Sequence, residues 1–281
     1  MRIIKLRDKI VAHCPEYIQN TKNITFVRAQ IEKGDIVMYT NRNFHEYYPN
    51  AQKHIALLME SIIMDKRYYD FILQNSNKYD LILTWSKELL DSGKDNIKLN
   101  LCGTTWLHPN YRKIYDKTKL CSLIASKKKF LPGHKLRHIL ISIIKQKNYP
   151  IDLYGSQFNN LPFSKESSPQ SLTNGKILAL KDYMFSVTIE NGKVDYEFTE
   201  KLIDCFLSGT VPIYWGCPSI GKFFNINGLI IIHDIADFHD IIPTLTREKY
   251  DNMLPYIREN FEIAKSYSDF KISEEAIQSL F

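Results

Sequence analysis

The sequence lacks the short signatures of several common enzyme classes. Its 281 residues hold only 11 glycines, and neither GxGxxG nor GxxxxGKS/T occurs, so the phosphate-binding loops of dinucleotide and P-loop enzymes are missing. There is no GxSxG nucleophile elbow and no HExxH zinc motif. Asp-x-Asp is also missing, although enzymes that hold a diphosphate through a divalent cation usually need closely spaced carboxylates. These patterns are therefore excluded as the source of any chemistry.

Cysteine and long apolar runs are scarce as well. The five cysteines are odd in number and form no CxxC pair, which favours buried thiols in a reducing compartment over disulfides or a zinc site. They are Cys14, Cys102, Cys121, Cys205 and Cys217. The first residues have no apolar core of signal-peptide length, and no run approaches the roughly 18 apolar residues of a membrane helix. We therefore predict a soluble, cytoplasmic protein, peripheral to a membrane at most.

The composition is that of a globular protein with a mild positive charge. Hydrophobic residues make up 44% and charged residues 24% of the chain, which is enough apolar mass for a core. A net charge of +6 suits an anionic ligand such as a nucleotide phosphate without requiring nucleic acid. The lysine run at 127–129 has no interleaved aromatics and is more typical of a solvated loop. We predict no nucleic-acid partner.

Short apolar runs alternate with helical patterns along the whole chain. This alternation predicts an α/β fold with parallel strands, and eleven strands favour two sheets over one. The expected strands are 2–6, 23–29, 35–40, 54–59, 79–85, 97–103, 120–126, 151–155, 185–191, 211–216 and 229–234. The expected helices are 65–77, 133–146, 198–209, 236–245, 247–267 and 273–281.

Two polar stretches interrupt this pattern. His108–Lys119 is the best linker candidate, and it divides the chain into a first domain, 1–115, and a second domain, 116–281, which includes the C-terminal helices. The stretch at 158–175 reads as a surface loop of the second domain. The sequence therefore predicts two domains with one sheet each.

The segment HDIADFHD, residues 233–240, allows two interpretations. Its histidines and aspartates are possible metal ligands. However, Asp237 also stands near the expected start of a helix, where backbone donors and the helix dipole favour acids. The helix-entry interpretation is the more ordinary one, and we favour it.

A strand–loop–helix unit in the second half suggests a ligand site. The strand ends in Glu190 and Asn191, the helix runs from about Thr199 to Ser208, and Gly209 suits the position just past its end. Ligands of open α/β sheets bind at such strand ends, and a helix N-terminus favours phosphate.

The polar side of this helix carries an acid and a base side by side. Glu200, Lys201 and Asp204 lie off the face that Leu202 and Phe206 predict to be buried. A lysine suits a diphosphate, whereas a carboxylate suits the two hydroxyl donors of a ribose. On pattern alone, an ordinary solvated first turn is the favoured interpretation.

The order of residues in this segment indicates a family. YMFSVTIENGKVDYEFTEKLIDCFLSGTVPIYWGCPSIGKFFN, residues 183–225, closely resembles the donor-binding motif of the α1,3/α1,4-fucosyltransferases. The matching residues are Tyr183, Phe185, Glu190, Asn191, Thr199, Glu200, Lys201, Leu202, Gly209, Thr210, Val211, Pro212, Ile213, Tyr214, Trp215, Gly216 and Pro218. The resemblance implies a GT-B fold of two Rossmann-like domains, with the acceptor bound by the first and GDP-fucose by the second.

The resemblance also implies an activity and residue roles. It implies an inverting transfer of L-fucose to a hydroxyl of an oligosaccharide or glycoconjugate, of the α1,3 type, without an essential metal or other cofactor. Glu200 is expected to hold the ribose and Lys201 the diphosphate, with Asn191 on a phosphate or on the sugar. Tyr214 and Trp215 are expected to pack in the core as a strand end.

Further matches and one departure complete the comparison. The stretch at 119–155 resembles the entry to the family's donor domain, with Ser126 and Arg137 in matching places. A second basic residue is expected on the phosphates, and Lys165, Lys176 and Arg137 are the candidates. One extra residue separates Tyr196 from the Thr-Glu-Lys triplet, so the contact of this tyrosine with the donor sugar is shifted.

The first domain contributes a candidate base. Glu60 ends an apolar strand and falls on a glutamate of the family's acceptor domain, so we expect it to take the proton from the acceptor hydroxyl. His54, Trp85 and Trp106 are candidate acceptor contacts. The shifted Tyr196 keeps open a transferase that uses another GDP-sugar such as GDP-mannose. A separate alternative is an inactive nucleotide-sugar-binding or scaffold protein, against which the intact Glu200-Lys201 pair and Glu60 argue.

Overall fold

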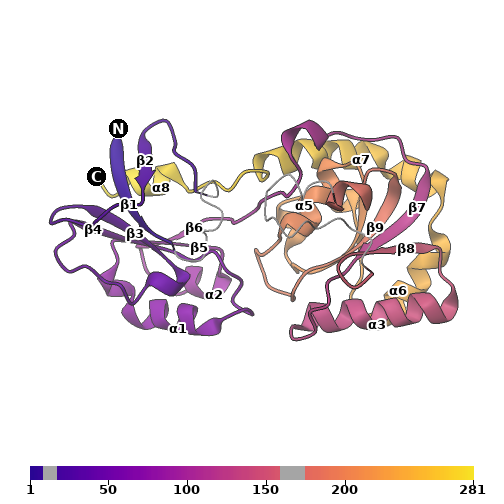
Figure 1. The fold of residues 1–281 in the computed structure, drawn as a ribbon, viewed down its shortest axis with the longest axis horizontal. Coiled ribbons are helices and arrows are strands. Elements are labelled where there is room, and N and C mark those ends of the chain that lie inside the picture. The colour runs from indigo at the N-terminus through magenta and orange to yellow at the C-terminus, as the bar shows by residue number, and fades with distance from the viewer. Residues whose placement is uncertain (9–17, 159–174) are drawn as a thin grey trace. The chain divides into compact units, whose positions relative to one another are not determined.

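The chain folds into two compact units. The computed structural model describes residues 1–8, 18–158 and 175–281, and Figure 1 shows their course. The first unit comprises Met1–Cys102 and Phe270–Phe281, and the second comprises Gly103–Asp269. Each holds one parallel sheet, and every predicted strand is present, so the predicted α/β class with two sheets is confirmed. Cys14, Lys165 and most of the stretch at 158–175 lie outside the described residues.

The first unit is built on a six-stranded sheet. All neighbouring strands run parallel, in the order β2-β1-β3-β4-β5-β6. The strands are β1 (Arg2–Arg7), β2 (Ile24–Val27), β3 (Ile36–Thr40), β4 (Lys53–Leu57), β5 (Leu81–Thr84) and β6 (Ile97–Leu99). The central strands β4 and β5 are almost continuously apolar, because both faces of a parallel sheet are covered by other elements.

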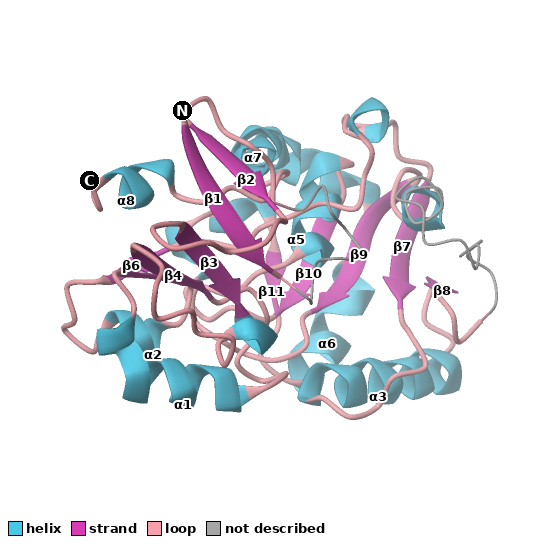
Figure 2. Ribbon diagram, turned by 60° about the vertical axis from the view of Figure 1, so that its left-hand side comes forward, coloured by secondary structure: helices cyan, strands magenta, loops and turns pink. Residues whose placement is uncertain are grey.

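Helices from both ends of the chain cover this sheet. The helices α1 (Lys66–Asn75) and α2 (Lys87–Leu90) lie on one side, and α8 (Glu274–Gln278) lies on the other (Figure 1 and Figure 2). Phe270 and Ile277 are buried in the same cluster as Ile4 of β1. The sequence-based division placed residues 103–115 in the first domain and the C-terminal helices in the second. The packing assigns residues 103–115 to the second unit and α8 to the first.

The second unit is built on a five-stranded sheet. Its strands are also parallel, in the order β11-β10-β9-β7-β8. They are β7 (Lys119–Ile124), β8 (Ile151–Tyr154), β9 (Tyr183–Ile189), β10 (Val211–Trp215) and β11 (Ile230–Ile231). The central strand β9 is buried along all seven of its residues. Solvent can therefore reach this part of the sheet only beyond the last residue of the strand.

Longer helices flank the second sheet. They are α3 (Pro132–Lys147), α5 (Glu200–Leu207), α6 (Ile235–Ile241) and α7 (Arg247–Ser266). Short 3-10 turns join the elements of both units, at η1 (Asn41–Asn43), η2 (Ser76–Lys78), η3 (Pro109–Tyr111), η4 (Ile220–Lys222), η5 (Ile226–Gly228) and η6 (Ile242–Thr244). Both views draw α3 and α7 on opposite sides of the sheet (Figure 1 and Figure 2). The helix α5 packs on β9, β10 and α7.

A buried lysine fixes the start of the second unit. The Lys117 ammonium is 3% exposed and donates to Leu180 O (3.1 Å), Lys181 O (3.1 Å), Ser208 O (2.7 Å) and Thr210 Oγ1 (2.9 Å). The carbonyl groups that it binds lie just beyond the end of α5 and just before β9. This side chain therefore connects the segment around Lys117 to both of these elements. The predicted linker at His108–Lys119 is therefore an integral part of the second unit.

The cysteines that the structure describes lie in the core, where the sequence predicts them. Cys102, Cys121, Cys205 and Cys217 are buried, as predicted. No helix in the described ranges combines the length and the hydropathy that crossing a membrane requires.

Candidate functional site

A buried carboxylate joins the end of β9 to the start of α5. Glu190 follows the strand and is 2% exposed. Its Oε1 accepts from the backbone N–H of Thr199 (2.9 Å), and its Oε2 accepts from the Thr199 hydroxyl (2.7 Å). Thr199 is also the N-cap of α5, since its side chain accepts from Lys201 N. The N-terminus of α5 is therefore fixed at the carboxyl end of the central strand.

The helix α3 braces the same strand end from another direction. Arg137 is 6% exposed, and its guanidinium donates to Ile189 O (3.2 Å) and to the Asn191 side-chain oxygen (3.0 Å). Burial lowers the pKa of this guanidinium, against the attraction of Glu190 and Glu200. Arg137 is thus a buried support that orients the Asn191 amide.

Glycine at position 133 is required for this close approach. Gly133 N donates to Asn191 O (2.9 Å), so the first turn of α3 lies against the loop after β9. A Cβ at this position would come 1.7 Å from Glu190 O, which is backbone and cannot move aside cheaply. Only glycine therefore allows α3 to pack at the end of β9.

Glu200 and Lys201 form an ion pair at the start of α5. The Lys201 ammonium lies 3.0 Å from Glu200 Oε1, 3.6 Å from Glu190 Oε2 and 3.1 Å from the Thr199 hydroxyl. Burial disfavours the charged carboxylate of Glu200, but the ammonium groups of Lys201 and Lys176 outweigh it and lower its pKa to about 2. Burial likewise opposes the charge on Lys201, yet Glu200 and Glu190 raise its pKa. Both side chains are therefore charged across the neutral range.

A second lysine lies beneath this pair. The Lys176 ammonium is 2.5 Å from Asp204 Oδ2 and 3.8 Å from Glu200 Oε1, and it stands 4.6 Å from the centre of the Trp106 ring. Asp204 is fully buried and also accepts from the hydroxyl of Thr105 and from Trp106 N (3.1 Å). Burial raises the pKa of Asp204, and Lys176 opposes that rise. The sequence-based expectation that Asp204 lies off the buried face is wrong, because Lys176 balances its charge inside the protein.

Sequence reasoning missed this inner ion pair, although the sequence contains one signal of it. Glu200 and Asp204 are four residues apart, so they share one side of α5 and require a nearby cation if that side is covered. Lys176 supplies this cation, and the fold brings it next to Asp204. Lys176 was a candidate for the phosphate contact, and its position under Glu200 rather than beside the open strand end changes that expectation.

Tyr196 occupies a backbone conformation that is unusual for a tyrosine. Its φ of 64° lies in the left-handed region. Its N–H donates to the Ser219 hydroxyl (3.1 Å), its hydroxyl accepts from Lys222 Nζ (3.2 Å), and its ring meets the edge of Phe223. The extra residue after this tyrosine is thus accommodated by a local turn, which the η4 region holds in place.

Ser126 stands at the same edge of the second sheet. It follows β7 by two residues, and β7 is hydrogen-bonded to β9. Because parallel strands end at one edge, Ser126 belongs to the side on which Glu190 and Asn191 lie. The structure therefore places Ser126, Asn191, Glu200 and Lys201 at one carboxyl edge, with Arg137 buried behind them.

Glu60 is placed at the corresponding edge of the first sheet. It follows β4 by three residues and is partly exposed. Its backbone is held by neighbours, since its N–H donates to Asn41 Oδ1 (3.4 Å) and its carbonyl accepts from the Tyr69 hydroxyl (2.5 Å). The side chain is thus carried on an anchored turn of the first unit.

The candidate acceptor contacts differ in exposure. His54 and Trp85 are buried, and the indole N–H of Trp85 donates to the Tyr69 hydroxyl (3.0 Å). Trp106 is 40% exposed but packs over Lys176 in the second unit. Tyr214 is buried as expected for a core strand, whereas Trp215 is partly exposed below Lys193.

The acidic segment at 233–240 is a helix entry. Asp234 caps α6 by accepting from Asp237 N (3.0 Å), and Asp237 accepts from His233 N (2.7 Å). The favoured interpretation is confirmed, with Asp234 rather than Asp237 as the cap. Within the described ranges, no three His, Cys, Asp or Glu side chains are grouped so that they could hold a metal ion.

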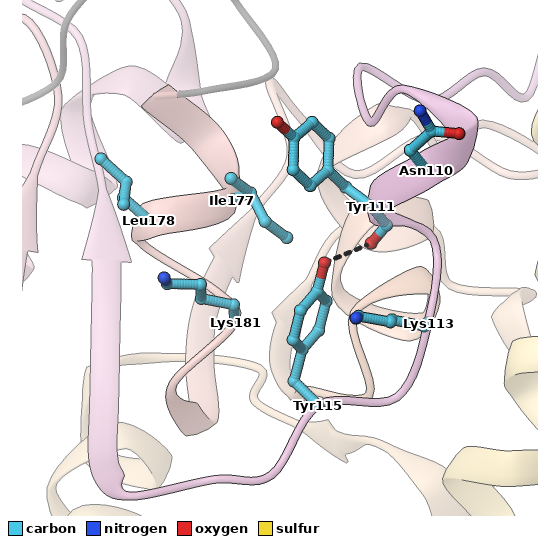
Figure 3. A pocket seen from close by; sticks show the side chains of 7 residues that line it. All are labelled: Asn110, Tyr111, Lys113, Tyr115, Ile177, Leu178 and Lys181. Atoms are coloured by element: carbon cyan, nitrogen blue, oxygen red, sulfur yellow. Dashed lines mark hydrogen bonds between the residues drawn. The ribbon is translucent and has the colours of Figure 1, made fainter.

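A pocket of about 420 Å³ lies elsewhere in the second unit (Figure 3). It is lined by Asn110, Tyr111, Lys113, Tyr115, Ile177, Leu178 and Lys181. The Tyr115 hydroxyl donates to Tyr111 O (3.1 Å) at its wall. Lys181 precedes β9 and Glu190 follows it, so a seven-residue strand of about 20 Å separates this pocket from the edge described above.

The fold defines the class of protein. A solved α1,3-fucosyltransferase with GDP superposes with a TM-score of 0.60 over 95% of this chain and 88% of that chain, at 19% identity. A structure titled TarM gives 0.54 over 89% of this chain and 56% of that chain, at 16% identity. The predicted GT-B fold of two parallel-sheet domains is confirmed.

The chain belongs to glycosyltransferase family 10, the fucosyltransferases. The family profile described as "Glycosyltransferase family 10 (fucosyltransferase) C-term" matches residues 114–270, more than half of the chain. The Alpha-(1,3)-fucosyltransferase FucT of Helicobacter pylori is 41% identical over 141 residues, which is 48% of this chain and 27% of that protein. The Putative fucosyltransferase R654 of Acanthamoeba polyphaga mimivirus is 26% identical over 193 residues, 62% of this chain and 31% of that protein. The chain thus spans about a third or less of these curated relatives.

Proposed function

We propose that this protein transfers L-fucose from GDP-fucose to a hydroxyl of a glycan acceptor, with inversion and with α1,3-type specificity. The observation that carries the proposal is the Glu200–Lys201 pair at the N-terminus of α5, opposite the carboxyl end of β9. Family membership supports the reaction class, and relatives named as fucosyltransferases support the sugar. Solved fold neighbours titled with GDP and GDP-fucose support the donor.

Glu200 and Lys201 divide the nucleotide between them in this proposal. The Glu200 carboxylate accepts from the two ribose hydroxyls, a role that needs the charged form which its low pKa maintains. Lys201 turns from Glu200 and Glu190 to the diphosphate, where the positive end of the dipole of α5 also favours an anion. Because these groups stabilise the leaving GDP, the proposal requires no essential metal.

The remaining predicted donor residues surround the sugar and phosphates. Asn191, oriented by Arg137, donates its amide N–H to a phosphate or to fucose. Ser126 contributes a hydroxyl from the end of β7, and Tyr196 presents its ring from the turn before α5. Arg137 acts through Asn191 and through its positive charge, since its own guanidinium is buried.

Glu60 serves as general base in the proposed reaction. The acceptor oxygen attacks the anomeric carbon as the bond to the GDP oxygen breaks, and the hydroxyl proton passes to the Glu60 carboxylate. A single displacement of this kind inverts the anomeric centre. The GDP leaves with the bonding electron pair, and Lys201 stabilises the resulting charge.

The first experiment tests the donor. GDP and GDP-fucose are expected to raise the melting temperature of the wild-type protein, whereas UDP and ADP are not, because a ligand that binds only the folded state stabilises it. Lys201→Ala should weaken GDP binding by at least about 10-fold in calorimetry, through loss of a charge-assisted contact. Lys135→Ala, on the exposed side of α3, is the matched control. Unchanged GDP affinity in Lys201→Ala contradicts the phosphate assignment.

The same melting-temperature measurement, extended to GDP-mannose, decides which GDP-sugar is the donor. A stronger response to GDP-mannose than to GDP-fucose, with transfer only from GDP-mannose, would replace fucose as the donor sugar. Binding of GDP-sugars without transfer or hydrolysis against a broad glycan panel would favour a nucleotide-sugar-binding protein.

The second experiment tests the base. Glu60→Gln should lower the transfer rate by about 10²–10⁴-fold while GDP binding stays unchanged, because general-base catalysis contributes that much. Glu88→Gln, an exposed acid at the first turn of α2, is the control in the same unit. Near wild-type turnover of Glu60→Gln removes this residue from the base role.

A further inference from the structure

Lys176 is a buried cation beside the candidate donor site. Its side chain is 8% exposed, and its ammonium contacts groups on several sides. Asp204 Oδ2 lies at 2.5 Å, Glu200 O at 3.3 Å, Glu200 Oε1 at 3.8 Å and the Trp106 ring centre at 4.6 Å. These contacts hold the ammonium on groups of the protein itself. We therefore assign Lys176 to the support of Glu200 and not to the phosphates.

The charges at this edge alternate in a row that begins and ends on buried carboxylates. The row consists of Asp204, Lys176, Glu200, Lys201 and Glu190, and the successive pairs are 2.5, 3.8, 3.0 and 3.6 Å apart. Lys201 is the more exposed of the two lysines, with 24% of its side chain accessible against 8% for Lys176. The outer lysine can therefore exchange partners with a ligand, whereas the inner one keeps its place.

Diphosphate binding changes the balance around Glu200. When Lys201 turns to the diphosphate, Glu200 loses the cation that stood at 3.0 Å and gains an anion nearby. A carboxylate with little access to water cannot keep its charge and direction without another cation. The nearest cation then left beside it in the described part of the chain is Lys176, at 3.8 Å, while Arg137 attracts it from farther away.

We propose that Lys176 is a positioning residue, which holds the Glu200 carboxylate charged and directed at the ribose diol while Lys201 binds the diphosphate. This inference rests on the proposed function and deepens it, because it assigns recognition of the ribose to a two-residue device. Asp204 and Trp106 fix Lys176 from behind, so that the device is set before the nucleotide arrives. In a variant without Lys176, we expect GDP still to bind Lys201, but the ribose hydroxyls no longer contribute to the affinity.

The test compares GDP with 2′-deoxy-GDP by calorimetry. The ratio of their dissociation constants reports how much Glu200 gains from the ribose, and Glu200→Gln gives the ratio with that carboxylate removed. Lys176 is replaced together with its buried partner, as Lys176→Met/Asp204→Asn, so that no unpaired charge is buried. Asp204→Asn alone measures what the partner substitution contributes to the double variant, since its amide oxygen still accepts from Trp106 N. Lys181→Met controls for the loss of a lysine five residues along.

The wild type and Lys181→Met should each bind 2′-deoxy-GDP about 10-fold more weakly than GDP. In the double variant the ratio should fall to that of Glu200→Gln. A purely structural role predicts instead that both nucleotides bind more weakly by the same factor, with the ratio intact, and that result overturns the inference. If the methionine variant does not fold, Lys176→Gln/Asp204→Asn supplies the same comparison.

The outcomes separate this inference from the proposed function. If the wild type does not bind GDP, or if Glu200→Gln leaves the ratio unchanged, the proposed donor site fails and the inference fails with it. If Glu200→Gln lowers the ratio and the double variant does not, the donor site stands and only the role of Lys176 is overturned.

Discussion

Glu200 shows how two lysines of different burial give one carboxylate a stable charge. Burial alone would raise its pKa, yet Lys201 and Lys176 lower the pKa to about 2 from its usual value of 4.5. Because the folded value lies below the unfolded one, the unfolded chain binds the proton more tightly. The charge on Glu200 therefore stabilises the fold fully above pH 4.5, and this contribution is lost as the pH falls toward 2.

Glu200→Gln should remove this part of the acid sensitivity. From the shift of the pKa, the charge contributes about 3 kcal/mol to the free energy of unfolding above pH 4.5. The difference in unfolding free energy between wild type and variant, measured with urea, should therefore shrink as the pH is lowered from 4.5 toward 2. Glu248→Gln, an exposed acid of α7, should show no such trend. A constant difference across this pH range contradicts the assigned charge coupling.

At the scale of the elements, the sequence predicted what local patterns determine. The strands follow from short apolar runs, and α5 begins at its Thr199 cap and ends just before Gly209, whose φ of 72° suits glycine. The sequence did not predict the ion pair of Asp204 with Lys176 or the close contact at Gly133. Each depends on residues 28 or more positions away along the chain. The roles proposed for the donor-site residues remain predictions until the binding experiments are made.

Lys117 provides a test of how the second unit holds its elements together. Its ammonium is the donor for three carbonyl groups and one hydroxyl, all within 3.1 Å. Lys117→Met should lower the free energy of unfolding by at least about 3 kcal/mol, since it leaves several buried acceptors without a donor. Lys135→Met, exposed on α3, should have little effect in the same urea titration. Equal stability of the two variants would show that water replaces the ammonium.

At the scale of the whole molecule, the chain returns to its first unit after completing its second. Residues 270–281 pack against the sheet of β1–β6, where Phe270, Ile272 and Ile277 are buried beside residues from the beginning of the chain. The sequence alone offers no reason to separate α8 from α7, because only residues 267–273 lie between the two helices. Which unit a terminal helix joins is decided by long-range packing.

Removal of residues 270–281 should therefore destabilise the first unit selectively. The deletion exposes apolar surface of that sheet, so the unfolding transition of the first unit should move to lower temperature in calorimetry. The shift that GDP produces in the second unit should persist, because the candidate donor site contains none of these residues. A deletion of Phe281 alone serves as control, since that side chain is 49% exposed. Loss of the GDP response in the longer deletion would show that the units are energetically inseparable.

The alternating row of charges has a consequence for ligand selection. Lys201 is paired with Glu200 and Glu190, so a small inorganic anion has to displace two carboxylates and offers them no hydrogen-bond donor. In the proposed donor site, a nucleoside diphosphate supplies an anion for the lysine and a diol for the glutamate in one molecule. For such a site the internal pairing would favour a ligand that carries both groups over a small free anion.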